Sequence, residues 1–236
     1  MCPALRIFDF IRSGMHTITA IEPQLKNPRR VNIYLDGEFG IGIARILAAW
    51  LQVGQQITDD KLTALEAEDK FETLKQKSLH FMGYRPRSCK EVRHNLLSHG
   101  AEEKLVEDVI QYHQKAGLLD DRKFAQGWVE NRNNFRQRSK AMLRNELRLK
   151  GIQEDIIQSV LDENVDEDAL ALAAARKHAR RYASMDWNEF RQKMGGFLAR
   201  RGFSYSTLSP VLSQVWKEIQ AADSGRTMEI EEKRDE

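Results

Sequence analysis

The chain has 236 residues, of which 41% are hydrophobic and 31% are charged, and its formal net charge is only +2 at pH 7. This composition is typical of a soluble protein with a buried core, and the 14 glycines and 5 prolines leave little room for disordered filler. No apolar run approaches the roughly 20 residues that cross a membrane. The 2 cysteines exclude a disulfide framework and favour a reducing cytoplasm.

The N-terminal residues 1–15 form a predicted extension that we expect to be disordered. Its apolar run is too short for a signal peptide and contains Asp9. The first well-patterned segment opens at Met15, so the sequence leaves open whether the true start is Met1 or Met15.

Residues 16–57 predict a small β-module. Apolar and other residues alternate over 31–35 and over 39–43, and an Asp-Gly pair at 36–37 separates the two runs. This pattern is a strong hairpin signal, because a type I′ turn needs positive φ at both central positions. Residues 17–21 supply a third predicted strand.

Two glycines, Gly40 and Gly42, interrupt the second hairpin strand. They predict a β-bulge, with a ligand approaching the backbone as the alternative. Residues 44–53 then predict a short helix that ends at Gly54 and packs on the sheet. Thr58 and the two aspartates after it predict the capped start of a long polar helix.

The rest of the chain repeats itself. Gly100, Gly151 and Gly202 are spaced 51 residues apart, and apolar residues recur four and eight positions before each of them. Other positions also match, namely Ser88 with Ser139, Arg87 with Arg138, and Val109 with Val160 and Val211. A fixed period with a dozen positions in register indicates a repeat array over residues 71–219.

Each repeat is predicted to hold three short helices. Ser88 and Glu91 form a capping-box pattern, apolar residues follow at helical spacing, and Gly100 stands where a helix stop needs a left-handed residue. The fold class is therefore mainly α, a tandem array of three three-helix repeats preceded by the small β-module. We assign the linker helix and first repeat to 58–120, the second repeat to 121–165, the third to 166–220, and an acidic disordered tail to 221–236.

Basic residues concentrate in two runs, at 122–150 and 176–201, that occupy equivalent parts of successive repeats. Such runs are often only solvated helix faces, but these are strongly one-signed, which favours a polyanion or an acidic protein groove as partner. Lys140, Arg144 and Arg148 are four residues apart and share one helix edge, where we expect them to face solvent. The candidate binding residues are Arg132, Arg136, Arg138, Lys140, Arg144, Arg148, Lys150, Arg180, Arg181, Arg200 and Arg201.

No catalytic constellation is visible. The six histidines lack metal-ligand spacing and are predicted to lie at the surface. Asp120 and Asp121 form an acidic pair, but the pattern favours helix capping by Asp120, with Asp121 at the positive helix end. We therefore expect no enzyme activity, no metal and no cofactor.

The segment around that pair resembles a known family. Gly117-Leu118-Leu119-Asp120-Asp121, then Phe124-Ala125, Trp128-Val129 and Arg132, is similar to the central motif of RecX regulatory proteins, and the resemblance extends over roughly residues 17–220. The third repeat departs most, with Trp187-Asn188-Glu189-Phe190 in place of the serine cap and Gly195-Gly196 inside a helix.

The resemblance implies a modulator of the RecA recombinase that lies in the groove of RecA filaments on single-stranded DNA. Family members limit recombinase, ATPase and coprotease activity in DNA repair and the SOS response. The implied protein is a cytoplasmic monomer with no membrane partner, and single-stranded DNA is a further candidate ligand. The alternatives are a helical nucleic-acid-binding protein that acts without RecA, and an interaction scaffold whose charge runs serve only solubility.

Overall fold

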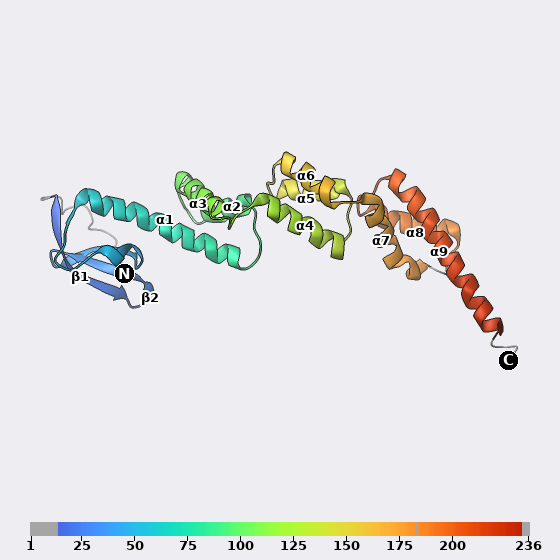
Figure 1. Cartoon of the computed structure of the whole chain (residues 1–236), viewed down its shortest axis with the longest axis horizontal. Coiled ribbons are helices and arrows are strands. Elements are labelled where there is room, and N and C mark those ends of the chain that lie inside the picture. Colours follow the sequence, from blue (N-terminus) through green and yellow to red (C-terminus); the bar gives the residue numbers. More distant parts are fainter. Residues whose placement is uncertain (1–13, 183, 233–236) are drawn as a thin grey trace. The chain divides into compact units, whose positions relative to one another are not determined.

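The structure is a computed structural model that describes residues 14–182 and 184–232 (Figure 1). The expected N-terminal extension lies almost entirely outside these residues. The chain divides into two compact units. The first contains the β-module, a long helix and most of the next two helices, and the second contains the segment Pro86–Glu91 and the chain from Gln114 onward.

The β-module is a four-stranded antiparallel sheet of order β3-β2-β1-β4. The predicted hairpin is confirmed, because Asp36 and Gly37 both have positive φ, 52° and 91°. The register of β2 against β3 skips Gly40, so the predicted bulge is also present. The strands are β1 (Met15–Gln24), β2 (Asn27–Leu35), β3 (Glu38–Ala44) and β4 (Gln56–Thr58), and the last of them was not predicted.

Helix α1 (Asp59–Gly83) covers the core of this sheet. The side chain of Thr58 accepts the amide of Lys61 and caps the helix, as the sequence predicts. Leu65 of α1 is buried in the same cluster as the inward residues of the strands. Asp69 ties helix to sheet, since it accepts a hydrogen bond from the amide of Ala44 at 2.7 Å and pairs with Arg30 at 2.7 Å.

The prediction of a helix over 44–53 is wrong in extent. Only a short 3-10 turn, η1 (Leu47–Trp50), forms there. Backbone pairing explains the difference, because the amide of Arg45 still bonds the carbonyl of Arg29 in the sheet at 2.8 Å. The helix that packs on the sheet is α1.

Helices α2 (Cys89–Ser98) and α3 (Glu103–Lys115) complete the first repeat. The predicted capping box is confirmed: Glu91 N donates to Ser88 Oγ at 3.2 Å, and Ser88 N donates to the Glu91 carboxylate at 3.3 Å. In the first unit, His113 of α3 is fully buried and bonds Ser78 of α1 at 2.6 Å.

The second unit contains two further three-helix groups, each with a core of its own. In the third repeat Asp186, not serine, caps the second helix by accepting the amides of Asn188 and Glu189. Phe190, which occupies the serine position, is instead fully buried. The elements are α4 (Asp121–Phe135), α5 (Lys140–Leu149), α6 (Glu154–Asn164), α7 (Glu167–Ala179), η2 (Arg180–Tyr182), α8 (Trp187–Ala199) and α9 (Tyr205–Glu232).

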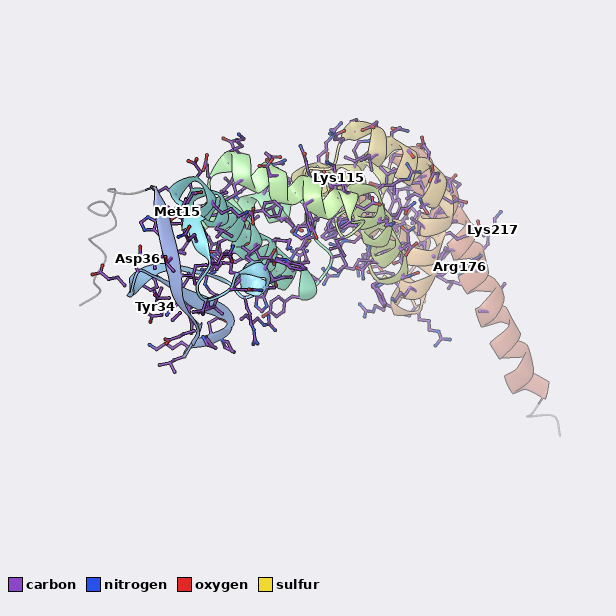
Figure 2. All side chains as sticks on the ribbon, turned by 60° about the vertical axis from the view of Figure 1, so that its left-hand side comes forward. Met15, Tyr34, Asp36, Lys115, Arg176 and Lys217 are labelled. Atoms are coloured by element: carbon purple, nitrogen blue, oxygen red, sulfur yellow. The ribbon has the colours of Figure 1, made fainter. Side chains whose placement is uncertain are left out.

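Helix α9 corrects the predicted boundary of the tail. The sequence places a disordered tail at 221–236, whereas α9 continues through Glu232. The earlier part of α9 packs on α7, and Arg176 of α7 pairs with Glu218 of α9 at 2.6 Å. Figure 2 labels Arg176 and Lys217, the residue before Glu218.

Gly100, Gly151 and Gly202 follow the second helix of each repeat, with φ of 78°, 80° and 87°. The predicted helix stops are therefore confirmed, since residues with a side chain rarely adopt this conformation.

Candidate functional site

The acidic pair of the central motif has a structural role. Asp120 accepts the amide of Lys123 at 3.0 Å and caps α4, and this hydrogen bond is the main cause that lowers the pKa of Asp120. Asp121 does something the sequence does not predict: its carboxylate accepts the amide of Cys89 at 2.8 Å, at the first turn of α2. The two adjacent carboxylates thus cap two different helices.

Trp128 and Glu146 organise the middle of the second repeat. The indole Nε1 of Trp128 donates to Glu146 at 2.7 Å, and Arg132 pairs with the same carboxylate at 2.9 Å while its guanidinium lies 4.4 Å from the Trp128 ring centroid. Arg138 also pairs with Glu146. The ammonium of Lys150 also lies over the Trp128 ring, 5.0 Å from its centroid. Three candidate binding residues are therefore engaged within the fold.

The predicted edge of Lys140, Arg144 and Arg148 is also engaged. Lys140 lies 3.5 Å from Asp162 of α6, and Arg144 and Arg148 lie 3.2 Å and 2.7 Å from Glu154. The hydrogen bond from Arg148 is the main cause that lowers the pKa of Glu154. These cations remain one-third to one-half exposed, but acidic groups already balance them, so they offer less charge to a partner than their spacing suggests.

The segment before α5 meets the end of α8 in what we call the second junction, formed by Arg136, Gln137, Arg138, Ser139 and Met142 against Arg201 and Gly202. The amide of Ser139 donates to the carbonyl of Arg201 at 3.1 Å, and Arg201 Nη1 returns a bond to the carbonyl of Gln137 at 2.9 Å. A Cβ at position 202 would lie 2.5 Å from both Ser139 Oγ and Met142 Cγ. Only glycine fits this contact.

A matching contact, which we call the first junction, joins the segment Pro86–Glu91 to the end of α5. Ser88 Oγ donates to the carbonyl of Lys150 at 2.7 Å, and the ammonium of Lys150 pairs with Glu91 at 2.8 Å. A Cβ at position 151 would lie 2.6 Å from Lys90 Cβ. The repeated serines and glycines of the sequence therefore meet each other across successive repeats.

The remaining candidate binding residues have fewer ion pairs with carboxylates. Among the side chains that the structure describes, in residues 14–182 and 184–222, no carboxylate pairs with Arg136, Arg180, Arg181 or Arg200. Burial and then the charges of Arg138 and Arg136 lower the pKa of Arg201, so these three guanidinium groups lie near one another. The structure thus separates the eleven predicted residues into paired and unbalanced groups.

Two histidines differ from the surface position predicted for all six. His16 is 8% exposed and bonds Asp36 and Asp59 at 2.9 Å each; the bond to Asp36 is the largest cause that raises its pKa. His113 is fully buried, and burial lowers its pKa. The part of the chain that the structure describes contains no cluster of His, Cys, Asp and Glu fit to hold a metal.

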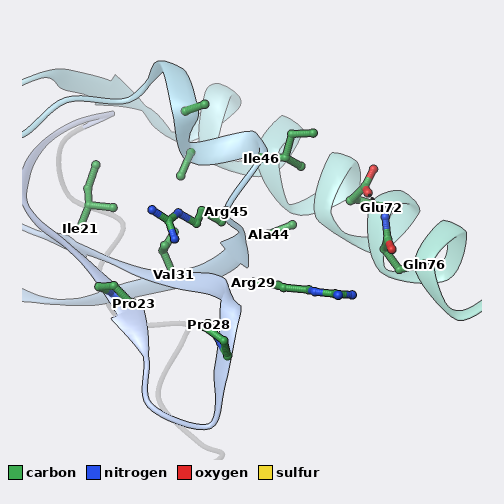
Figure 3. A pocket seen from close by; sticks show the side chains of 12 residues that line it. Ile21, Pro23, Pro28, Arg29, Val31, Ala44, Arg45, Ile46, Glu72 and Gln76 are labelled. Carbon is green, nitrogen blue, oxygen red and sulfur yellow. Dashed lines mark hydrogen bonds between the residues drawn. The ribbon is translucent and has the colours of Figure 1, made fainter. Parts of the chain in front are cut away.

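The first unit also has an open groove of about 760 Å³ on the β-module (Figure 3). Arg29 and Arg45 lie beside it, outside both predicted basic runs. Its other lining residues are mostly apolar, among them Ile21, Pro23, Pro28, Val31, Ala44 and Ile46. Sequence patterning could not find it, because its walls come from three strands, β1, β2 and β3, together with η1 and α1.

Comparison with known proteins identifies the family. Four domain models match in order along the chain: the regulatory protein RecX N-terminal domain at 16–58, and the first, second and third RecX three-helix domains at 75–112, 120–161 and 166–212. The chain belongs to the RecX family.

Curated RecX relatives span nearly the same length. The regulatory protein RecX of Clostridium tetani is 29% identical over 209 residues, which is 86% of this chain and 96% of the relative. The regulatory protein RecX of Bacillus subtilis is 28% identical over 205 residues, or 85% of this chain and 78% of the relative. The predicted family is therefore confirmed, and it is a family of regulatory proteins.

Solved RecX structures share the fold. A crystal structure of regulatory protein RecX matches with a TM-score of 0.67 at 26% identity, covering 83% of this chain and 98% of its own. RecX from Lactobacillus salivarius matches with a TM-score of 0.57 at 23% identity, covering 63% and 97%. Among the described residues, no helix is long and apolar enough to cross a membrane.

Proposed function

We propose that this RecX protein binds filaments of the RecA recombinase on single-stranded DNA, in the filament groove, and modulates them, mostly by inhibition. The observation that carries the proposal is the ordered match of all four RecX domains over most of the chain. The motif residues themselves support the fold, so the protein acts by binding and has no catalytic activity of its own. Because its partner works on DNA, the proposal places the protein, as a monomer, in the cytoplasm.

The basic residues left unbalanced by the fold support this choice of partner. A RecA filament on DNA presents phosphates and acidic side chains, and exposed guanidinium groups suit both. The paired cations Lys140, Arg144 and Arg148 contribute less, because contact with a filament would first have to break their bonds to α6.

The test is DNA-dependent ATP hydrolysis by RecA, measured with increasing amounts of the full-length protein. We expect suppression at substoichiometric amounts, together with slower strand exchange, and no hydrolysis by the protein with DNA alone. Unchanged RecA ATPase and strand exchange at equimolar protein would overturn the proposal.

A further inference from the structure

The second junction gathers positive charge where the fold supplies little to balance it. Arg201 is held in place by its bond to the Gln137 carbonyl and by the ring of Phe197, whose centroid lies 4.5 Å from its guanidinium. Gln137 stands between Arg136 and Arg138, so the same bond brings all three arginines to one locus.

The acidic partners at this locus are few. Glu146 pairs with Arg138, and the same carboxylate also pairs with Arg132 and accepts a hydrogen bond from the Trp128 indole. Within the described ranges, no carboxylate pairs with Arg136 or Arg201. The lowered pKa of Arg201, caused by burial and by the two neighbouring arginines, is consistent with an electrostatic field that favours an anion.

In the first junction, a carboxylate neutralises the cation at the position equivalent to Arg201. Lys150 occupies the position of Arg201, and Glu91 forms an ion pair with it at 2.8 Å. In the second junction the residue at the Glu91 position is Met142, which carries no charge. Among the described side chains, the equivalent cation therefore pairs with a carboxylate in the first junction and with none in the second.

An exposed aromatic residue directly precedes this group of arginines in the chain. Phe135 ends α4, directly before Arg136, and is 69% exposed. Arginines that can grip phosphates next to an exposed ring are the pair of features by which proteins hold single-stranded nucleic acid: charge for the backbone and a π-face for a base.

We propose that Arg136, Arg138 and Arg201 form a phosphate-binding site for single-stranded DNA, with Phe135 as a stacking platform for one base. The inference deepens the proposed function and rests on it only for the source of the strand, which would be the DNA of the filament. Binding is sequence-tolerant, because neither a guanidinium–phosphate contact nor ring stacking reads a base edge.

The experiment measures binding of the full-length protein to a fluorescently labelled oligothymidylate, about 16 nucleotides long, by anisotropy over a series of salt concentrations. We expect the double variant Arg136→Gln, Arg138→Gln to bind roughly tenfold more weakly. Its plot of log affinity against log salt should lose a slope of about 1.4, since each lost phosphate contact on a single strand accounts for about 0.7.

The matched control is Arg122→Gln, Arg176→Gln, which removes two arginine charges that each pair with a separate carboxylate, Glu163 at 2.7 Å and Glu218 at 2.6 Å. It should bind like wild type, with the same salt slope. A further variant, Phe135→Ala, should bind several-fold more weakly with an unchanged salt slope, because stacking releases no counterions. Circular dichroism checks the fold of each variant, and Phe135→Ala keeps the test decisive if the arginine variant misfolds.

Three results would overturn the inference. Equal loss in the arginine variant and its control would show a general charge effect. Wild-type binding by both the arginine variant and Phe135→Ala would show that DNA lies elsewhere. Normal binding to DNA alone, with weakened binding to RecA filaments, would show that the site meets acidic protein side chains. If the DNA results are as expected but RecA ATPase is unaffected by wild type, the proposed function fails and the site stands.

Discussion

The two junctions join equivalent positions by different hydrogen bonds and differ in charge. In the first, Ser88 Oγ donates to the carbonyl of Lys150, and in the second, the amide of Ser139 donates to the carbonyl of Arg201. In both, a serine at the start of one helix meets the end of the equivalent helix in the following repeat, and a glycine of positive φ lets the chains approach. Lys150 is neutralised by Glu91, whereas in the second junction the position equivalent to Glu91 holds Met142, which carries no charge. The serine and the glycine recur in both junctions and preserve the packing, whereas the charge differs between them. We therefore look for function in the charge difference.

The largest expected effect separates the glycines that sit in a junction from the one that does not. Gly151→Ala and Gly202→Ala should each lower the free energy of unfolding by about 2–4 kcal/mol, because left-handed strain adds to a collision with Lys90 or with Ser139 and Met142. Gly100→Ala should cost only about 1 kcal/mol, since a Cβ there meets nothing within 4 Å. Urea unfolding followed by circular dichroism measures all three, and equal losses would contradict the junction contacts.

The second prediction converts one junction into the other. Met142→Glu places a carboxylate where the first junction has Glu91, so it should pair with Arg201 and weaken binding of labelled single-stranded DNA roughly tenfold. Met142→Gln, which has a similar size and no charge, is the control and should bind nearly as wild type does. If both variants bind alike, charge at this position does not decide the difference between the junctions.

The third prediction concerns Asp121, whose carboxylate bonds the segment Pro86–Glu91 of the first junction and whose equivalent one period later is Leu172. Asp121→Ala should lower stability by about 1 kcal/mol and speed hydrogen exchange at the amide of Cys89, which Asp121 accepts. Asp120→Ala should cost a similar amount but speed exchange at Lys123 instead. Exchange that accelerates at Lys123 in both variants would mean that Asp121 serves its own helix only.

The smallest effect is a pH dependence near the second junction. Burial, followed by the charges of Arg181, Arg201 and Lys177, lowers the pKa of His178 below its ordinary 6.5. The unfolded chain therefore binds more protons than the folded one as pH falls through 6.5, and His178 lowers stability in that range. Nuclear magnetic resonance titration should find this pKa low and find it raised when single-stranded DNA is bound, because phosphates offset the neighbouring cations.

His113 is the internal control for that titration. Its pKa is also lowered, mainly by burial, but it lies against Ser78 in the first unit. Added DNA should not change the pKa of His113. If DNA is bound at saturation and the pKa of His178 does not change, the strand does not lie next to Arg201.

The sequence correctly predicts those structural elements that depend on residues close together in the chain. The capping box of Ser88 and Glu91, the Asp36-Gly37 turn and the three helix-stop glycines each depend on residues a few positions apart, and all are confirmed. The helix expected over 44–53 does not form in full, because the amide of Arg45 bonds the carbonyl of Arg29 in the neighbouring strand. Propensity does not register such a distant competitor.

The candidate site was harder to predict for the same reason. Four-residue spacing correctly places Lys140, Arg144 and Arg148 on one edge of α5, but it cannot show that Glu154 and Asp162 of α6 lie opposite them. The role of Asp121 was missed because its partner amide is 32 residues away in the chain. One signal was present in the sequence: the 51-residue register itself aligns Glu91 with Met142 and Lys150 with Arg201, which marks where the charge balance changes.

The paired halves of the junction also bear on how such a chain can grow. The second repeat carries Ser139 on one side and Gly151 on the other, so it holds both halves of the connector. A tandem copy of this segment would meet its neighbours through contacts that already exist, with no new interface to evolve. Gene duplication in steps of one repeat is thus structurally inexpensive for this fold, and the length of the array is open to selection independently of its packing.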